Sequence, residues 1–155
     1  MLIALKNLFA ELSGADAAKS AKAAKAEQQQ LRMAVAGLLR EMMRIDSKQG
    51  PEEMQTAIAG LVGMFALSDP EAKALLDGAG AQRLTSYFDP ASTIKRLLSV
   101  GQRSILVENL WRIAFADADL DIYEDQFVRK IADLIYVSNT ECMLARQRAR
   151  NAVTT

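Results

Sequence analysis

The 155-residue chain contains no histidine and a single cysteine, Cys142. Without histidine it cannot form a Ser-His-Asp triad, a Cys-His dyad, a His- or Cys-rich zinc site, or the Glu-x-x-His pairs of a di-iron bundle. One cysteine cannot make an internal disulfide either, which fits a reducing compartment. Because Cys142 falls within a helical pattern, we interpret it as a small core residue rather than a reactive thiol.

An excess of charge of one sign is also missing, because Lys plus Arg and Asp plus Glu both number 19. This balance removes the global electrostatic argument for nucleic acid, so no nucleic-acid partner is predicted. The local group formed by Arg146, Arg148 and Arg150 is interpreted as a solvated helix face.

The chain has no long hydrophobic run. Its first twelve residues are interrupted by Lys6 and Asn7 and follow no basic region, so we expect neither a signal peptide nor a membrane span. One helical face of this segment is apolar and contains Leu2, Leu5, Leu8, Phe9 and Leu12. We expect this face to dock on the domain, because only one positive charge accompanies it, with peripheral contact to a membrane through residues 1–12 as the alternative.

No segment alternates between apolar and polar residues over the length of a strand, so the chain is predicted to be all-α. Half of its residues are hydrophobic, which at this length suffices for one core and one domain. We assign residues 1–30 to an N-terminal amphipathic segment and an Ala-, Lys- and Gln-rich stretch, either a linker or a solvated helical lead-in. Residues 31–152 form the predicted domain.

Apolar residues recur at three- and four-residue spacing from Leu31 onward and predict a helix that ends near Asp46. We expect Gly78 and Gly80 to end a later helix, and Gly101 to separate a short helix from a longer one over 102–116. The starts of the other predicted helices are marked by Pro51, Ser68, Asp121 and Ser138.

The two halves of the chain repeat each other at an offset of 117 − 46 = 71 residues. At this offset Asp46 matches Asp117 and Glu53 matches Glu124; the other matched pairs are Leu39 with Leu110, Met42 with Ile113, and Gln55 with Gln126. An offset of 70 then pairs Ser68 with Ser138. A duplicated helical hairpin predicts a pseudo-symmetric helical bundle, in which the two turns lie either near one another or at opposite ends.

The repeated acids suggest a cation site. Asp46 and Asp117 end helices, where the helix dipole disfavours a negative charge by about 0.3–1 kcal/mol each, so something should compensate them. Carboxylate and carbonyl oxygens suit Ca²⁺, Mg²⁺ or Mn²⁺, and Zn²⁺ is kept as a further candidate. The candidate metal ligands are Asp46, Glu53, Asp117, Asp119, Asp121 and Glu124. The second turn is not an EF-hand loop, because it has Ile122 and Val128 where glycine and glutamate are needed.

Helix capping is the competing interpretation of the glutamates. Asp121 and Glu124 have the spacing of a capping box, and Glu53 occupies the equivalent position after Gly50 and Pro51. Capping explains the glutamates without a metal, but it does not explain Asp46 and Asp117.

The segment from Leu110 to Asp125, LWRIAFADADLDIYED, and its echo LREMMRID over residues 39–46 resemble the TerB-like tellurite-resistance family. The resemblance covers roughly residues 30 to 150. It implies an all-helical domain that carries the acidic motif twice, with links to metal binding and to stress-response complexes at the bacterial inner membrane. The matching acids would be Asp46, Glu53, Asp117 and Glu124, and the chain departs from the family pattern at Ser47 and Ala118, where glycine is frequent.

Three functions compete at this point. The first is a non-enzymatic, cytoplasmic stress-response scaffold that binds a divalent cation at its acidic turns, which the sequence favours. The second is a metal-independent protein–protein interaction module, peripheral to the inner membrane or free of it, with a second copy of the chain among its candidate partners. The third is an enzyme that uses the carboxylates, which we do not favour because no nucleophile–base constellation can be assembled.

Overall fold

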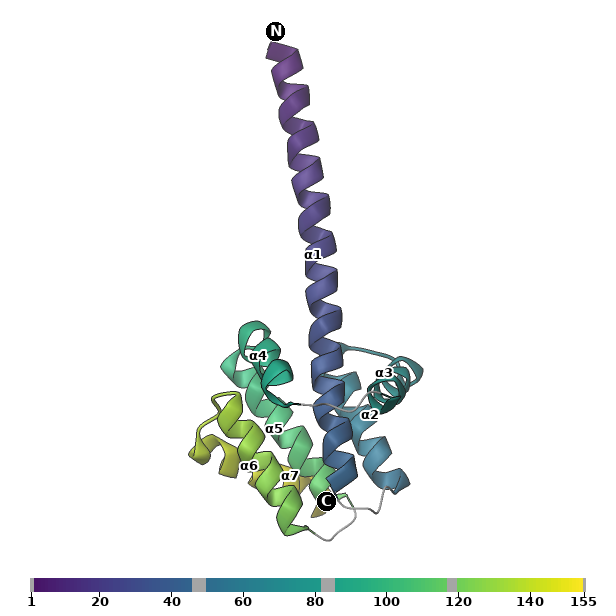
Figure 1. The fold of residues 1–155 in the computed structure, drawn as a ribbon, viewed down its shortest axis with the longest axis vertical. Helices are drawn as coiled ribbons and strands as arrows, with labels where there is room; N and C mark the ends of the chain where they lie inside the picture. Colours follow the sequence, from purple (N-terminus) through teal and green to yellow (C-terminus); the bar gives the residue numbers. More distant parts are fainter. Residues whose placement is uncertain (1, 46–49, 82–85, 117–119, 155) are drawn as a thin grey trace. The chain divides into compact units, whose positions relative to one another are not determined.

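The computed structural model describes residues 2–45, 50–81, 86–116 and 120–154, and it describes side chains from Ala17 to Ala152 within these ranges except that of Phe88. The described residues form helices only, which confirms the predicted all-α class (Figure 1). The helices are α1 (Leu2–Ile45), α2 (Pro51–Phe65), α3 (Asp69–Ala81), α4 (Phe88–Leu97), α5 (Val100–Phe115), α6 (Ile122–Leu134) and α7 (Asn139–Thr154).

The chain divides into two compact units, Met1–Gln30 and Leu31–Thr155. Helix α1 runs through both units without a break, so the lead-in is helical rather than an extended linker. The described side chains of its first unit, residues 17–30, are all exposed. This exposure is expected from the sequence, because the stretch carries almost no large apolar residue.

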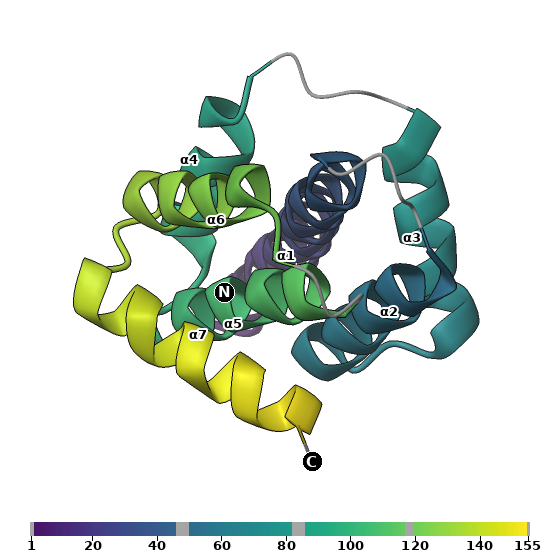
Figure 2. The same cartoon turned by 90° about the horizontal axis from the view of Figure 1, so that it is seen from below.

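The second unit is organised around the hydrophobic stripe of α1 and the buried residues of α5. The stripe is buried as the spacing predicts, and its buried members are Leu31, Val35, Leu38, Leu39, Met42 and Met43. Helix α5 packs against α2, α6 and α7, while α3 packs against α2 and α4 against α6 (Figure 2). Trp111 of α5 is fully buried and donates a hydrogen bond from Nε1 to the carbonyl oxygen of Cys142 at 3.2 Å.

Local signals explain most helix starts. Pro51 begins α2 after the extended Gly50, and the hydroxyls of Ser68 and Ser138 accept hydrogen bonds from the third residues of α3 and α7. Helix α5 starts earlier than predicted, at Val100, because Ser99 and Gln102 form a reciprocal capping box. Gly101 therefore lies inside the first turn and separates no elements, contrary to the prediction.

The prediction that Gly78 and Gly80 end α3 is also wrong, since the helix continues to Ala81. Gly80 has a packing role instead. A Cβ atom on it would lie 2.8 Å from Nε of Arg40, and its carbonyl oxygen accepts a 2.6 Å hydrogen bond from Nη2 of Arg44. Both arginines belong to α1, so the glycine allows α3 to approach that helix closely.

Cys142 is buried in the core, as predicted. Burial raises the pKa of its thiol above the ordinary value, and the indole of Trp111 opposes this shift. A buried thiol with a raised pKa carries little thiolate near neutral pH, which agrees with a packing role.

Helix starts in the two halves are spaced as the repeat requires. Helix α6 begins 122 − 51 = 71 residues after α2, and α7 begins 139 − 69 = 70 residues after α3. These spacings equal the two offsets of the sequence match. A two-fold relation between the halves in space stays a prediction.

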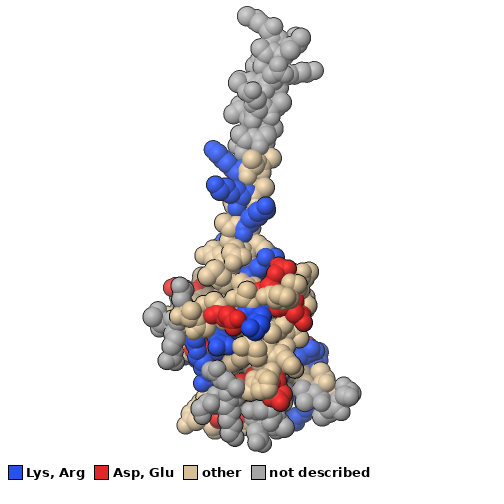
Figure 3. Space-filling model, turned by 90° about the vertical axis from the view of Figure 1, so that its right-hand side faces the viewer, with Lys and Arg blue, Asp and Glu red and all other residues tan. Residues whose placement is uncertain are grey.

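None of the helices is both long and apolar enough to cross a membrane, a finding that covers the described residues only. On the face shown in Figure 3, acidic and basic side chains are interspersed over the described surface of the second unit, in keeping with the equal numbers of the two charges.

Candidate functional site

The first turn of α6 contains two of the predicted metal ligands, and they form a capping box. Oδ1 of Asp121 accepts a hydrogen bond from the backbone N–H of Tyr123 at 3.0 Å, and Oε1 of Glu124 accepts one from the backbone N–H of Asp121 at 3.3 Å. The interpretation of Asp121 and Glu124 as a helix-capping pair is thus confirmed. One oxygen of each carboxylate is engaged by the backbone.

Glu53 occupies the corresponding position in α2. It is the third helical residue after Gly50, as Glu124 is the third after Asp121. Both side chains are only 1% exposed, and both interact with other groups of the chain, as carboxylates buried to this extent usually do. Both first turns lie at the lower end of the second unit in Figure 1.

Burial separates these two glutamates from others at the same helical position. Glu71 and Glu141 are also third residues of their helices, α3 and α7, and Ser68 and Ser138 cap those helices. Glu71 is exposed and the side chain of Glu141 is 37% exposed. Capping alone therefore does not require a glutamate at this position to be buried.

Three of the six predicted ligands, Asp46, Asp117 and Asp119, lie outside the described residues. The described acids Asp121 and Glu124 lie together, and Glu53 stands on a different helix. Within the described ranges, no group of three or more His, Cys, Asp or Glu residues is placed to hold a metal ion.

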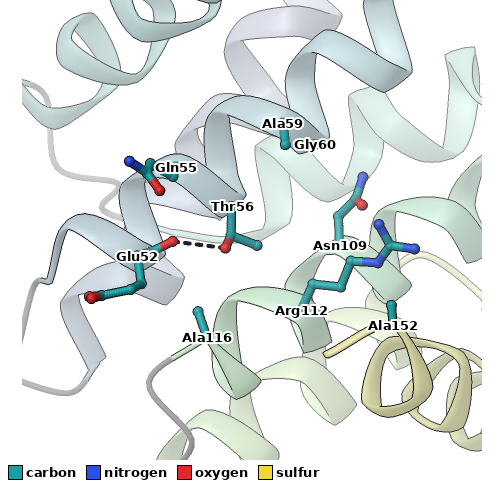
Figure 4. A pocket seen from close by; sticks show the side chains of 9 residues that line it. All are labelled: Glu52, Gln55, Thr56, Ala59, Gly60, Asn109, Arg112, Ala116 and Ala152. Carbon is teal, nitrogen blue, oxygen red and sulfur yellow. Dashed lines mark hydrogen bonds between the residues drawn. The ribbon is translucent and has the colours of Figure 1, made fainter. Parts of the chain in front are cut away.

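A groove of about 440 Å³ lies between α2 and α5, with α7 at its rim (Figure 4). Glu52 and Ala116 take part in its lining, and they immediately precede Glu53 and the second acidic turn in the chain. The described lining residues are Glu52, Gln55, Thr56, Ala59, Gly60, Asn109, Arg112, Ala116 and Ala152. The flanks of the two acidic turns thus meet at one groove.

Sequence reasoning missed this groove and its buried polar residue, Asn109, which is 8% exposed. A signal was available in the repeat. At the 71-residue offset, Asn109 matches Leu38 and Gly60 matches Ile131, so a polar residue and a glycine stand where the other half has core residues.

An ion-pair chain connects α5 with α7 beside the groove. Glu108 pairs with Arg112 at 3.0 Å and with Arg148 at 2.7 Å, and Arg148 also reaches Glu141 at 3.6 Å. Arg148 and Arg150 are exposed, as the solvated-face interpretation predicts, and the guanidinium group of Arg150 lies over the ring of Phe115. Arg146 departs from that interpretation, because it is half-buried over the rings of Trp111 and Phe115.

The family model described as "Tellurite resistance protein TerB" matches residues 32–147, which is most of the chain. The chain belongs to the TerB family. The match begins within the buried stripe of α1 and extends into α7, so it includes both acidic turns and both walls of the α2–α5 groove. No curated protein and no solved structure shows significant similarity to this TerB chain.

Proposed function

We propose that this TerB chain is a non-enzymatic, tellurite-resistance-type domain that binds a divalent cation at its two acidic turns and uses the cation to order the helix ends. The observation that carries the proposal is the burial of Glu53 and Glu124, at matching positions of the repeat, to 1% exposure. Family membership supports the domain type, and the site chemistry is inferred from the residues.

A cation would offset the cost of these carboxylates. The positive end of each helix dipole and the backbone donors lower the cost of burying a carboxylate there. They do not account for Asp46 and Asp117, which the sequence places after helix ends, where the dipole is unfavourable. A hard divalent cation shared by a buried glutamate and the preceding aspartate would compensate both.

The test is thermal unfolding of EDTA-stripped full-length protein with added Ca²⁺, Mg²⁺, Mn²⁺ or Zn²⁺. A cation at about 100 times its dissociation constant should add about 2.7 kcal/mol of stability, which corresponds to about 5–10 °C in Tm for a domain of this size. Asp117→Asn/Glu124→Gln should abolish most of this shift, and Glu53→Gln should reduce it.

Glu71→Gln is the matched control, because Glu71 is also a third-residue glutamate but is exposed. It should leave the cation-dependent shift unchanged. If no cation stabilises the wild-type protein, or if the control lowers the shift as much as Glu124→Gln does, the cation proposal fails and the acids are structural. Hydrolysis of phosphoesters with Mn²⁺ would contradict the non-enzymatic part.

A second candidate function, a metal-independent interaction module, is favoured by an exposed apolar surface at the α5–α7 side. Val100, Ile105 and Tyr136 are 64%, 50% and 74% exposed, and all three line one groove of about 650 Å³. Large apolar side chains gathered at one exposed place are typical of interaction sites.

We propose a second copy of this chain as the occupant of that surface. A two-fold contact needs a self-complementary patch, and the groove carries charges of both signs, Glu141 and Arg148, beside its apolar residues. Within one chain these two side chains pair at 3.6 Å, and a second copy can extend this pair across the contact.

Light scattering or sedimentation at concentrations up to about 100 μM should show the wild-type protein approaching twice its mass of 17.0 kDa. Ile105→Glu should keep it monomeric. Met33→Glu, a change at another residue that is 54% exposed, serves as the control and should not change the mass. A wild-type protein that stays monomeric over this range would exclude the dimer.

A further inference from the structure

We propose that the groove between α2 and α5 is a ligand-binding site that takes a carboxylate group, held by the side chains of Asn109 and Arg112. The carboxylate can belong to a small organic acid or to the free end of a peptide. This site is separate from the cation proposal, because neither residue is among the predicted metal ligands.

Asn109 is the main reason to expect a ligand. It is 92% buried, yet among the described residues its side-chain amide makes no hydrogen bond to the protein. The amide atoms are not sealed in the core, so they are open to whatever occupies the groove. Because Asn109 lines the groove, its amide is placed to bond to a molecule held there (Figure 4).

Arg112 supplies the charge beside this amide. It lies three residues after Asn109 on α5, and Figure 4 shows the two side chains next to each other on the same wall. Its Nη2 is paired with Glu108, and its side chain is 43% exposed, so part of the guanidinium group is open to the groove. An amide N–H and a guanidinium N–H from one wall match the two oxygens of a carboxylate.

The opposite wall lets the side chain of Asn109 approach closely. Gly60 faces Asn109, and a Cβ atom on Gly60 would lie 3.3 Å from both Cγ and Nδ2 of the asparagine. Ala59 extends this wall, and Ala116 and Ala152 complete the small-residue lining. Among the described lining residues the acid is Glu52, and it directs its carboxylate away from Asn109 and Arg112 in Figure 4.

The groove residues can be compared with the matching positions in the other half of the repeat. At the 71-residue offset the groove residues Thr56, Gly60, Asn109 and Ala116 correspond to Phe127, Ile131, Leu38 and Ile45. The first three of these are buried in the core, and Ile45 packs against it. One half thus has apolar core residues at the positions where the other has a threonine, a glycine, an asparagine and an alanine that line a groove.

The experiment is NMR titration of ¹⁵N-labelled full-length protein in EDTA, so that the cation site and the groove are tested apart. The probes are glutarate, the tripeptide Ala-Ala-Ala with a free C-terminus, and their uncharged counterparts glutaramide and Ala-Ala-Ala amide. We expect at least one carboxylate probe to produce saturable shifts of the Asn109 side-chain amide and the Gly60 backbone amide, with Kd on the order of 1 mM or below. Its uncharged counterpart should bind at least about tenfold more weakly.

Two variants and a matched control assign the contacts. Asn109→Leu and Arg112→Gln should each weaken binding at least about tenfold. Arg129→Gln should not, although Arg129 is similarly exposed and likewise pairs with an acid four residues earlier, Asp125. Arg112→Gln changes a half-exposed residue, so it tests the site even if Asn109→Leu alters the fold.

The pattern of binding also identifies the source of the carboxylate. Binding of glutarate alone indicates a small acid, and binding of the tripeptide alone indicates a chain end. The proposal is overturned if neither carboxylate shifts these resonances, if the uncharged counterparts bind equally well, or if Arg129→Gln weakens binding as much as Arg112→Gln.

Discussion

Replacement of Trp111 by alanine is expected to lower the free energy of unfolding by about 4 kcal/mol. Trp111 is fully buried, its ring stacks on that of Phe115 at a centroid distance of 6.0 Å, and its Nε1 bonds to the carbonyl oxygen of Cys142. Alanine would leave a large cavity between α5 and α7 and remove the indole hydrogen bond to Cys142, whose carbonyl keeps its helical partner. Urea unfolding at 25 °C measures the loss, which is large beside a typical total of about 5–15 kcal/mol.

Trp111→Phe separates the two contributions. Phenylalanine keeps a ring beside Phe115 but loses the hydrogen bond to Cys142, so this variant should cost less, about 1–3 kcal/mol. A loss below about 1 kcal/mol for Trp111→Ala would mean that the packing between α5 and α7 contributes little to stability.

The second large effect is expected at the two positions related by the repeat. Leu38→Asn should destabilise the domain by about 3–5 kcal/mol, because it removes a fully buried leucine and buries an amide among apolar side chains. Asn109→Leu, the reverse change, should cost nothing or increase stability, because it replaces an amide that has no hydrogen bond to the described residues.

Urea unfolding of the two variants gives the comparison directly. The two changes exchange nearly the same atoms in opposite directions, so their difference reports the environments rather than the residue types. Equal losses for both variants would show that Asn109 contributes to folding as Leu38 does, and would remove the energetic argument for a ligand in the groove.

Much of the fold followed from local signals that act over one helical turn. The apolar spacing of α1, the Pro51 start of α2 and the serines before α3 and α7 were predicted and are present. The capping box of Asp121 and Glu124 was also readable as a spacing. Such features depend on neighbouring residues in the chain, so a sequence contains the information they need.

The glycines show where local reasoning ends. Glycine often ends a helix, yet α3 continues through both Gly78 and Gly80. The role of Gly80 is set by Arg40 and Arg44, which approach it from another helix. Arg44 lies 36 residues earlier in the chain than Gly80. Single-residue propensities of about 1 kcal/mol are readily outweighed by such packing.

The candidate sites divide in the same way. The sequence named the acids, because their duplication at one offset is visible in the residues alone. It could not tell Glu53 and Glu124, which are buried, from Glu71 and Glu141, which occupy the same helical position and are more exposed. Burial depends on which helices cover the first turn, and that is a property of the assembled bundle.

The sequence by itself determined the all-helical class, the family, most helix starts and the paired acids, because each rests on periodicity, spacing or a motif within one segment. Only the tertiary structure decided that Asn109 packs against Gly60 and that both residues line a groove. The physical reason is that the volume between two helices is set by side chains distant in sequence, and a cavity appears only when both walls are in place.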